Sequence, residues 1–215
     1  LLGDTIEEID WSTGQILKKL KDLGIDSNTM VIFTSDNGPG HHSLRKPNQS
    51  AYPLRRGKAS VYEGGIRVPC IVRWPGKIEG NRIEAKSGIM MDWFPTFMAM
   101  TGGSMPADRP HDGRDLSDLL FNSGDRSDSE FYANFIAGWY GDVKKHVYEI
   151  MEHRSGKWKY VALNGGELYN LEKDISETNN VKSKMENMSK KEMDRIHHMT
   201  PSPERGKQRS ITYTG

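Results

Sequence analysis

Two short stretches decide the fold, MVIFTSDNG at residues 30–38 and LRRGKASVYEGGIRVP at residues 54–69. The first is a β-branched apolar run that ends in Ser-Asp-Asn-Gly, so a buried strand here carries a carboxylate and an amide into the loop that follows. Such a strand end is a natural place to hold a hard cation. The second stretch supplies Lys58 among glycines that allow close backbone approach, so its charge can reach an anion bound to that cation.

The flanking segments predict alternating helices and strands. Apolar residues recur at helical spacing over residues 4–23, and Gly24 stands where a left-handed cap would end this helix. We expect the amphipathic helix to lie on a sheet, and residues 29–34 to form a buried strand, because their apolar residues are consecutive rather than alternating. A helix followed by a buried strand is half of a parallel α/β repeat.

Less regular sequence follows. Residues 38–59 lack periodicity and predict a long loop, a kind of segment that is usually functional or mobile. Residues 68–74 predict a second apolar strand and residues 87–91 a third, short one. Residues 92–101 predict a helix with Asp92 as its N-cap.

The pattern changes near residue 128. Beyond it, four short runs rich in aromatic and β-branched residues predict a small antiparallel sheet, at 131–135, 147–152, 157–163 and 167–170. A helix is expected over 183–199, and a frayed tail from residue 201. The predicted organisation is an α/β core domain over 1–128, a small α+β subdomain over 129–200 and a flexible tail over 201–215.

Composition excludes some classes of function. The 215 residues carry 30 Lys and Arg against 29 Asp and Glu, a formal net charge of +1, which gives no reason to expect nucleic acid as a partner. No apolar run approaches the roughly 20 residues that span a bilayer. The single cysteine excludes an internal disulfide.

At TSDNGP (residues 34–39) and GKASVYEGGIRVP (residues 57–69) the sequence resembles the sulfatase family of the alkaline-phosphatase superfamily. The likeness continues through RWPG at 73–76, DWFPTFMAMTG at 92–102 and DGRDL at 112–116, and covers roughly residues 1–181 in the order of the family's C-terminal half. The resemblance implies the C-terminal part of a sulfatase-type α/β sandwich with a small C-terminal antiparallel sheet plus helix. It also implies hydrolysis of sulfate esters.

The resemblance further implies a formylglycine nucleophile, made from the cysteine or serine of a C-x-P-x-R type motif. Cys70, in the setting PCIVRW, lacks the proline and is expected inside a buried strand, so it is a poor candidate. The family's upstream Asp-Asp pair is also missing from these residues. We therefore expect a fragment that is inactive alone and is completed by the N-terminal half of the same protein. The compartment stays open, since only the resemblance suggests a periplasmic, secreted or lysosomal location.

Asp36 and Asn37 are the predicted metal ligands. Their oxygens suit Ca²⁺ or Mg²⁺ better than zinc. Spacing alone leaves a plain turn at a strand end equally open, whereas the resemblance implies a metal site, with Ca²⁺ favoured over Mg²⁺. Because Ca²⁺ takes about six to eight oxygens, two ligands predict weak binding or none in this chain by itself.

Lys58 matches the family's sulfate-contacting lysine, which helps to neutralise charge on the transferring group. His41 and His42 lie in the long loop and are candidates for substrate contact or proton donation, with simple exposure as the alternative. Arg55 and Arg56 are candidates for binding an anionic substrate, a sulfated small molecule or carbohydrate, although paired basic residues in a loop are commonly solvated.

The EGGIR segment, with Glu63, Gly64, Gly65 and Arg67, is expected to shape a turn rather than contact substrate.

Two other functions of the protein stay open. One is a phosphoesterase or phosphonate hydrolase of the same superfamily, because the fold alone does not choose between sulfate and phosphate. The other is a non-catalytic binding module that keeps the fold without a nucleophile.

Overall fold

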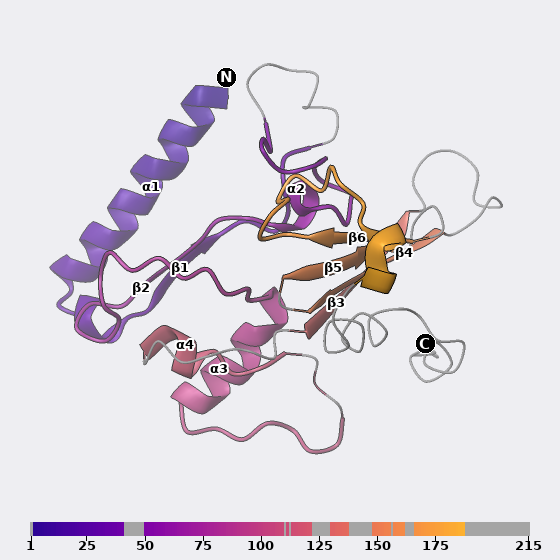
Figure 1. Cartoon of the computed structure of the whole chain (residues 1–215). Coiled ribbons are helices and arrows are strands. Elements are labelled where there is room, and N and C mark those ends of the chain that lie inside the picture. Colours follow the sequence, from indigo (N-terminus) through magenta and orange to yellow (C-terminus); the bar gives the residue numbers. More distant parts are fainter. Residues whose placement is uncertain are drawn as a thin grey trace, which may run out of the picture. The chain divides into compact units, whose positions relative to one another are not determined.

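The structure is a computed structural model of the 215-residue chain (Figure 1). It describes residues 2–40, 50–109, 111, 113–121, 130–137, 148–155, 157–161 and 166–187, with the backbone alone over 130–137, 148–155 and 185–187. Contacts divide the chain into two compact units. The first comprises Leu1–Asp36 and Pro69–Ser127, and the second Asn37–Val68 and Asp128–Gly215.

The first unit contains a two-stranded sheet, one long helix and several short ones. Strand β1 pairs antiparallel with β2, in a register that runs from Val31 opposite Arg73 to Thr34 opposite Cys70. The elements are α1 (Leu2–Asp22), the 3-10 helix η1 (Asp26–Asn28), β1 (Val31–Thr34), β2 (Cys70–Arg73), the 3-10 helix η3 (Met90–Asp92), α3 (Trp93–Met100) and α4 (Ser117–Phe121).

Helix α1 confirms the helix predicted over residues 4–23, and Gly24 follows it with a φ of 70°. The expectation that it lies on a sheet is wrong for the described residues, because none of its side chains is buried, and Ile6 and Ile16 are 58% and 59% exposed. A helix of 21 residues is about 32 Å long, whereas two strands make a sheet only about 10 Å wide. The β1–β2 sheet therefore cannot cover the apolar face of α1.

Strands β1 and β2 confirm the strands predicted at 29–34 and 68–74, but their burial was predicted wrongly. Phe33 is 42% and Ile71 60% exposed, and Cys70 is exposed as well. The pairing is antiparallel, not the parallel pairing of an α/β repeat. Within the described part of this unit the two strands pair only with each other, and Val72 of β2 packs against the buried cluster of Leu116, Leu119 and Leu120.

The RWPG stretch fastens β2 to the turn before β1. The guanidinium of Arg73 donates to both carboxylate oxygens of Asp26, at 2.7 and 2.8 Å, and the indole of Trp74 donates to the carbonyl of Ser27 at 3.0 Å. The hydrogen bond from Arg73 holds the pKa of Asp26 below its ordinary value. This stretch therefore has a structural role.

Asp92 organises the other half of the unit. The strand predicted at 87–91 is wrong, because the buried Asp92 carboxylate accepts a hydrogen bond from the backbone N–H of Ile89 at 2.8 Å and draws the chain into η3. Its other oxygen accepts from the N–H of Arg114 at 2.8 Å. Thr96, one turn further along the predicted helix, accepts from the N–H of Leu116 at 2.9 Å. The DWFPT and DGRDL stretches are thus held together.

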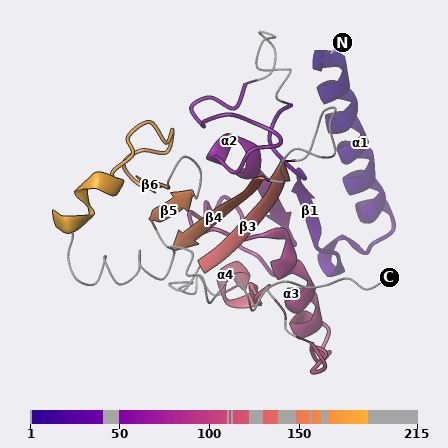
Figure 2. The same ribbon diagram turned by 90° about the vertical axis from the view of Figure 1, so that its right-hand side faces the viewer.

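The second unit contains a four-stranded antiparallel sheet in the order β3-β4-β5-β6, which Figures 1 and 2 show side by side. The four runs predicted beyond residue 128 are all confirmed as strands. The elements are α2 (Glu63–Ile66), β3 (Glu130–Ala137), β4 (Tyr148–Ser155), β5 (Trp158–Val161), β6 (Glu167–Asn170) and the 3-10 helix η4 (Lys182–Asn187).

The structure describes only part of the C-terminal region for which a helix and a tail are predicted. The start of the helix expected over 183–199 is the 3-10 helix η4, preceded by Asn180, whose side-chain oxygen accepts from the N–H groups of Leu168 and Lys182 at 3.0 Å each. The rest of that helix and the tail lie outside the described residues. None of the described helices has the length and apolarity to cross a membrane.

The compact units differ from the expected domains in one segment. Residues 37–68 group with the C-terminal strands, whereas the sequence analysis assigned them to the first domain. The physical reason is a set of buried contacts between α2 and the strands, described below. The division into evolutionary domains stays a prediction.

Replacing Asp92 by Ala should destabilise the chain by about 3 kcal/mol, because two part-buried N–H groups, those of Ile89 and Arg114, lose a charged acceptor. Asp108 offers a matched control, since it is exposed and bonded only to its neighbour Arg109 among the described residues. Asp108→Ala should leave the urea midpoint almost unchanged. Equal urea midpoints for Asp92→Ala and wild type would show that Asp92 does not organise this unit.

Candidate functional site

The SDNG stretch leaves the sheet directly after β1. Thr34, the last residue of the strand, donates its hydroxyl to the carbonyl of Pro69 at 2.9 Å, which fixes the strand end beside the start of β2. Asp36 then lies exposed, and the half-buried Asn37 donates its side-chain N–H to the carbonyl of Gly38 at 3.0 Å.

Main-chain hydrogen bonds bring this stretch to the segment at residues 50–62, which we call the Lys58 loop. The N–H of Gly38 donates to the carbonyl of Gly65 at 2.9 Å, and the N–H of Lys58 donates to the carbonyl of Pro39 at 2.7 Å. The Lys58 side chain is exposed. The structure therefore joins the two stretches that the sequence singled out, although about twenty residues separate them.

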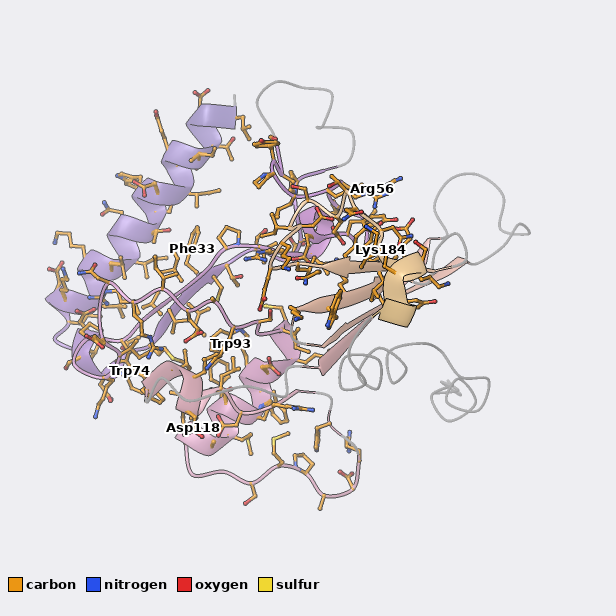
Figure 3. All side chains as sticks on the ribbon, viewed as in Figure 1. Phe33, Arg56, Trp74, Trp93, Asp118 and Lys184 are labelled. Atoms are coloured by element: carbon orange, nitrogen blue, oxygen red, sulfur yellow. The ribbon has the colours of Figure 1, made fainter. Side chains whose placement is uncertain are left out.

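Glycine is required where these segments cross. A Cβ on Gly38 would collide with the carbonyl of Gly64, and a Cβ on Gly64 would collide with the carbonyl of Arg56. On either side of Lys58, Arg56 and Ala59 adopt positive φ values of 61° and 67°, which are strained for residues with a side chain. Figure 3 labels Arg56 where many side chains of this unit gather around α2. The Lys58 loop is held in a conformation that an isolated peptide would seldom adopt.

A buried cluster of charges anchors α2 to the sheet. Lys159 on β5 is fully buried, and its ammonium lies 2.9 Å from a carboxylate oxygen of Glu63 and 2.9 Å from one of Glu177. The second oxygen of Glu177 accepts from the backbone N–H of Glu63 at 2.7 Å. Arg67 approaches Glu63 from the surface at 3.4 Å. Glu63 thus fixes the turn, as expected, through partners that lie about a hundred residues away.

The cluster holds two carboxylates for one buried ammonium. Burial raises the pKa of Glu177, and the nearby ammonium of Lys159 counteracts only part of that effect. Sequence reasoning missed Lys159 and Glu177. The sequence shows only a lysine between the aromatic residues of WKYV, and the burial of all four residues of this strand is a finding of the structure.

Arg55 is held by a second polar network. Its Nη1 donates to the hydroxyl of Tyr169 at 2.8 Å and to the carbonyl of Glu177 at 3.1 Å, and its guanidinium lies 3.8 Å from the centre of the Tyr62 ring. Both tyrosine hydroxyls donate to one oxygen of Glu167, at 2.6 and 2.7 Å. Burial, with the Glu167 hydrogen bond second, raises the pKa of Tyr62 to about 12. Tyr62 therefore remains a protonated donor near neutral pH.

Of the three remaining predicted site residues, the structure describes only Arg56. Arg56 is exposed, with its guanidinium 5.5 Å from the centre of the Tyr62 ring, while His41 and His42 lie outside the described residues. Whether any of them, Arg55 or Lys58 contacts substrate stays a prediction.

The predicted metal ligands suit a hard cation in kind but are too few. Asp36 and Asn37 offer oxygen donors at a strand end, yet in the described ranges no three His, Cys, Asp or Glu side chains gather closely enough to hold a metal. A Ca²⁺ ion takes about six to eight oxygens. Further ligands would have to come from other groups.

Comparison with known proteins identifies the class. The family model described as Sulfatase matches residues 2–103, and the model described as N-sulphoglucosamine sulphohydrolase, C-terminal, matches residues 56–201. The chain belongs to the sulfatase family. This confirms the predicted resemblance and, with the solved structures below, the predicted fold class.

Curated relatives agree with the family assignment. Mouse steryl-sulfatase is 39% identical over 148 residues, which cover 67% of this chain and 24% of the relative. The N-acetylgalactosamine-6-sulfatase of the dog is 45% identical over 114 residues, 53% of this chain and 22% of the relative. The chain thus spans about a quarter of the length of the curated relatives that it matches.

Solved structures show the same fold. A protein named Ps i-CgsB, solved in complex with k-i-k-neocarrahexaose, superposes with a TM-score of 0.72 at 27% identity, over 88% of this chain and 40% of that one. The phosphonate monoester hydrolase of Agrobacterium radiobacter superposes with a TM-score of 0.64 at 22% identity, over 90% of this chain and 39% of that one. The latter likeness concerns the fold alone.

The buried cluster predicts opposite results for two substitutions. Lys159→Met should destabilise the chain by about 3–5 kcal/mol, because two buried carboxylates lose their counter-charge. Glu177→Gln should cost far less, since the single amide oxygen can still accept from the N–H of Glu63, one buried charge disappears, and Glu63 keeps its ion pair with Lys159 at 2.9 Å. Urea unfolding at pH 7 measures both. Comparable losses would contradict the proposed charge balance.

The stability of the wild type and that of Glu177→Gln should depend differently on pH. A carboxyl with a raised folded-state pKa stabilises the fold fully below its unfolded value, 4.5 for Glu177, and this contribution is lost as the pH rises through the raised value. Wild-type stability should therefore include a decline above pH 4.5 that Glu177→Gln lacks.

Proposed function

We propose that the protein hydrolyses sulfate esters and that this chain contributes part of the sulfate-binding and metal-binding groups. The observation that carries the proposal is the joining of the Lys58 loop to the SDNG stretch, through Lys58 to Pro39 at 2.7 Å and Gly38 to Gly65 at 2.9 Å. This junction occurs in a chain of the sulfatase family. It supports a shared site for an anion and a cation.

Lys58 is the residue proposed to bind the sulfate group. Its exposed side chain is carried by a strained loop, so the backbone from which the ammonium extends is set before substrate arrives. A fixed positive charge stabilises negative charge that develops on the transferring group.

Asp36 and Asn37 are proposed to bind Ca²⁺, with Mg²⁺ as the alternative. When bound, such a cation polarises a sulfate oxygen as a Lewis acid. The two side chains supply oxygens at the end of β1, and the remaining ligands are proposed to come from the family's upstream carboxylates. The formylglycine nucleophile is proposed to come from the completing N-terminal half, since these 215 residues contain no motif for it.

The proposed substrate is a sulfated small molecule or carbohydrate. The relatives' names cover both kinds, with a steryl-sulfatase and an N-acetylgalactosamine-6-sulfatase among them. One structural neighbour was solved in complex with k-i-k-neocarrahexaose.

Two rival functions have specific support. The fold likeness to a phosphonate monoester hydrolase keeps phosphate or phosphonate chemistry as an alternative. The lack of a nucleophile motif in these residues keeps a non-catalytic binding module as another. The three functions are separated by measuring turnover of an aryl sulfate and of an aryl phosphate by the protein completed with a sulfatase N-terminal half. Faster cleavage of the sulfate supports the proposal, and faster cleavage of the phosphate supports the phosphoesterase. Cleavage of neither supports the binding module.

In that completed protein, Lys58→Ala should lower kcat/KM for an aryl sulfate by about 100-fold or more, as expected for loss of one group that stabilises developing charge. Lys77→Ala is the matched control, because Lys77 is an exposed lysine of the first unit. Thermal unfolding should be unaffected in both. Wild-type turnover in Lys58→Ala would refute the role of this lysine.

Calorimetry on the chain alone should detect weak Ca²⁺ binding or none, since two side chains fall short of the six to eight or so oxygens that the ion takes. Submicromolar affinity would contradict an incomplete ligand set. If weak binding is seen, Asp36→Ala should remove it, whereas Asp108→Ala should not, because Asp108 is paired with Arg109 at 2.8 Å.

A further inference from the structure

The second unit has an open surface cavity that the proposed chemistry does not use. Its volume is about 600 Å³, within the range of sites for small molecules. It is lined by side chains from the Lys58 loop, from β6 and from the segment after β6, among them Tyr52, Arg55, Tyr169, Ser176 and Thr178. All three segments belong to the second unit, so the cavity is formed within a single compact body.

Arg55 offers hydrogen-bond donors to this cavity. Its contacts to Tyr169, Glu177 and Glu167 all run through Nη1. In the described part of the chain nothing accepts from its Nε or Nη2, and 32% of the side chain is exposed. Stacking on Tyr62 at 3.8 Å fixes the plane of the guanidinium. One edge of a rigid donor group is thus left for a ligand.

Tyr52 supplies an apolar surface next to these donors. It is 88% exposed, which is unusual for so large a ring and leaves its faces accessible. Ser176, on the opposite segment, is half-buried and adds a hydroxyl that both donates and accepts. A flat ring beside a few fixed polar groups matches a sugar, which has an apolar C–H face and a rim of hydroxyls.

The charges around the cavity favour a neutral ligand group over an anion. The cations Arg55 and Arg56 are balanced by Glu167, 3.6 Å from Arg55, and by Asp174, whose oxygens accept from Thr178 and Asn179. The carboxylate of Glu177 is turned to Lys159 at 2.9 Å. No net positive charge is therefore left to attract a sulfate, and the polar lining suits hydroxyls better than a sterol.

We infer that this cavity is a saccharide subsite, in which a sugar ring packs on Tyr52 and its hydroxyls bond to Arg55 and Ser176. The inference rests on the proposed function, because it assigns the sulfate to Lys58 and the sugar to this cavity. Arg55 precedes Lys58 by three residues, so their Cα atoms are at most about 11 Å apart, roughly the reach of one or two sugar rings.

Binding is tested on the intact chain without turnover and without added metal. Saturation-transfer NMR titrates galactose, galactose 6-sulfate and, as the sterol probe, estrone sulfate. Both sugars should bind with similar millimolar affinity, because the sulfate lies outside the cavity, and estrone sulfate should not compete with galactose. Tyr52→Ala should weaken galactose binding about tenfold, a change of ~1.4 kcal/mol, while Tyr52→Phe should retain it.

Three further variants locate the sugar. Ser176→Ala should weaken galactose binding, whereas Lys58→Ala should leave it unchanged. Trp11→Ala is the control for losing an exposed aromatic ring, since Trp11 is 65% exposed in the other unit. Galactose binding that survives Tyr52→Ala, falls with Trp11→Ala or depends on Lys58 would overturn the inference.

These results are independent of the proposed function. If the completed protein does not cleave sulfate esters but galactose binding depends on Tyr52, the hydrolase proposal fails and the sugar subsite remains. If turnover is seen but sugar binding does not depend on Tyr52, only the subsite is refuted.

Discussion

Lys159 lies fully buried between the carboxylates of Glu63 and Glu177, and the second unit is organised around this contact. Desolvating three charges is costly, so the arrangement persists only because each carboxylate has a close partner. Glu177 also bonds the backbone of Glu63, which fixes the first residue of α2. Through Gly65 and Gly38, α2 in turn fixes the SDNG stretch. The candidate site is thus held by residues that would never meet the substrate.

Close backbone packing transmits this constraint to Lys58. The Lys58 loop wraps α2 so tightly that Gly64 and Gly65 have no room for a Cβ. The strain at Arg56 and Ala59 is tolerated because the surrounding contacts determine the loop. The same loop presents Tyr52 and Arg55 to the neighbouring cavity. One rigid segment can therefore place a cation for an anionic group and a polar surface for the remainder of a ligand.

The first unit uses neutral and charge-assisted hydrogen bonds for a similar purpose. Asp92 and Thr96 hold the segment at 113–116, and Arg73 with Trp74 holds the turn at η1. These residues lie in the motifs that carry the family resemblance, yet their contacts are structural. A motif in this family thus marks either chemistry or architecture, and only the contacts distinguish the two.

The sequence by itself determined the strands β1, β2 and β3 to β6, helices α1 and α3, and the family, because each depends on local periodicity, capping or a contiguous motif. Residues 87–91 do not form the strand that their β-like pattern predicts, because the buried Asp92 carboxylate accepts a hydrogen bond from the N–H of Ile89. The exposure of Cys70 and the antiparallel pairing of β1 with β2 depend on which layers surround the strands. Tertiary structure alone decided that Lys159 and Glu177 support the site, because a contact between residues about a hundred positions apart leaves no local pattern.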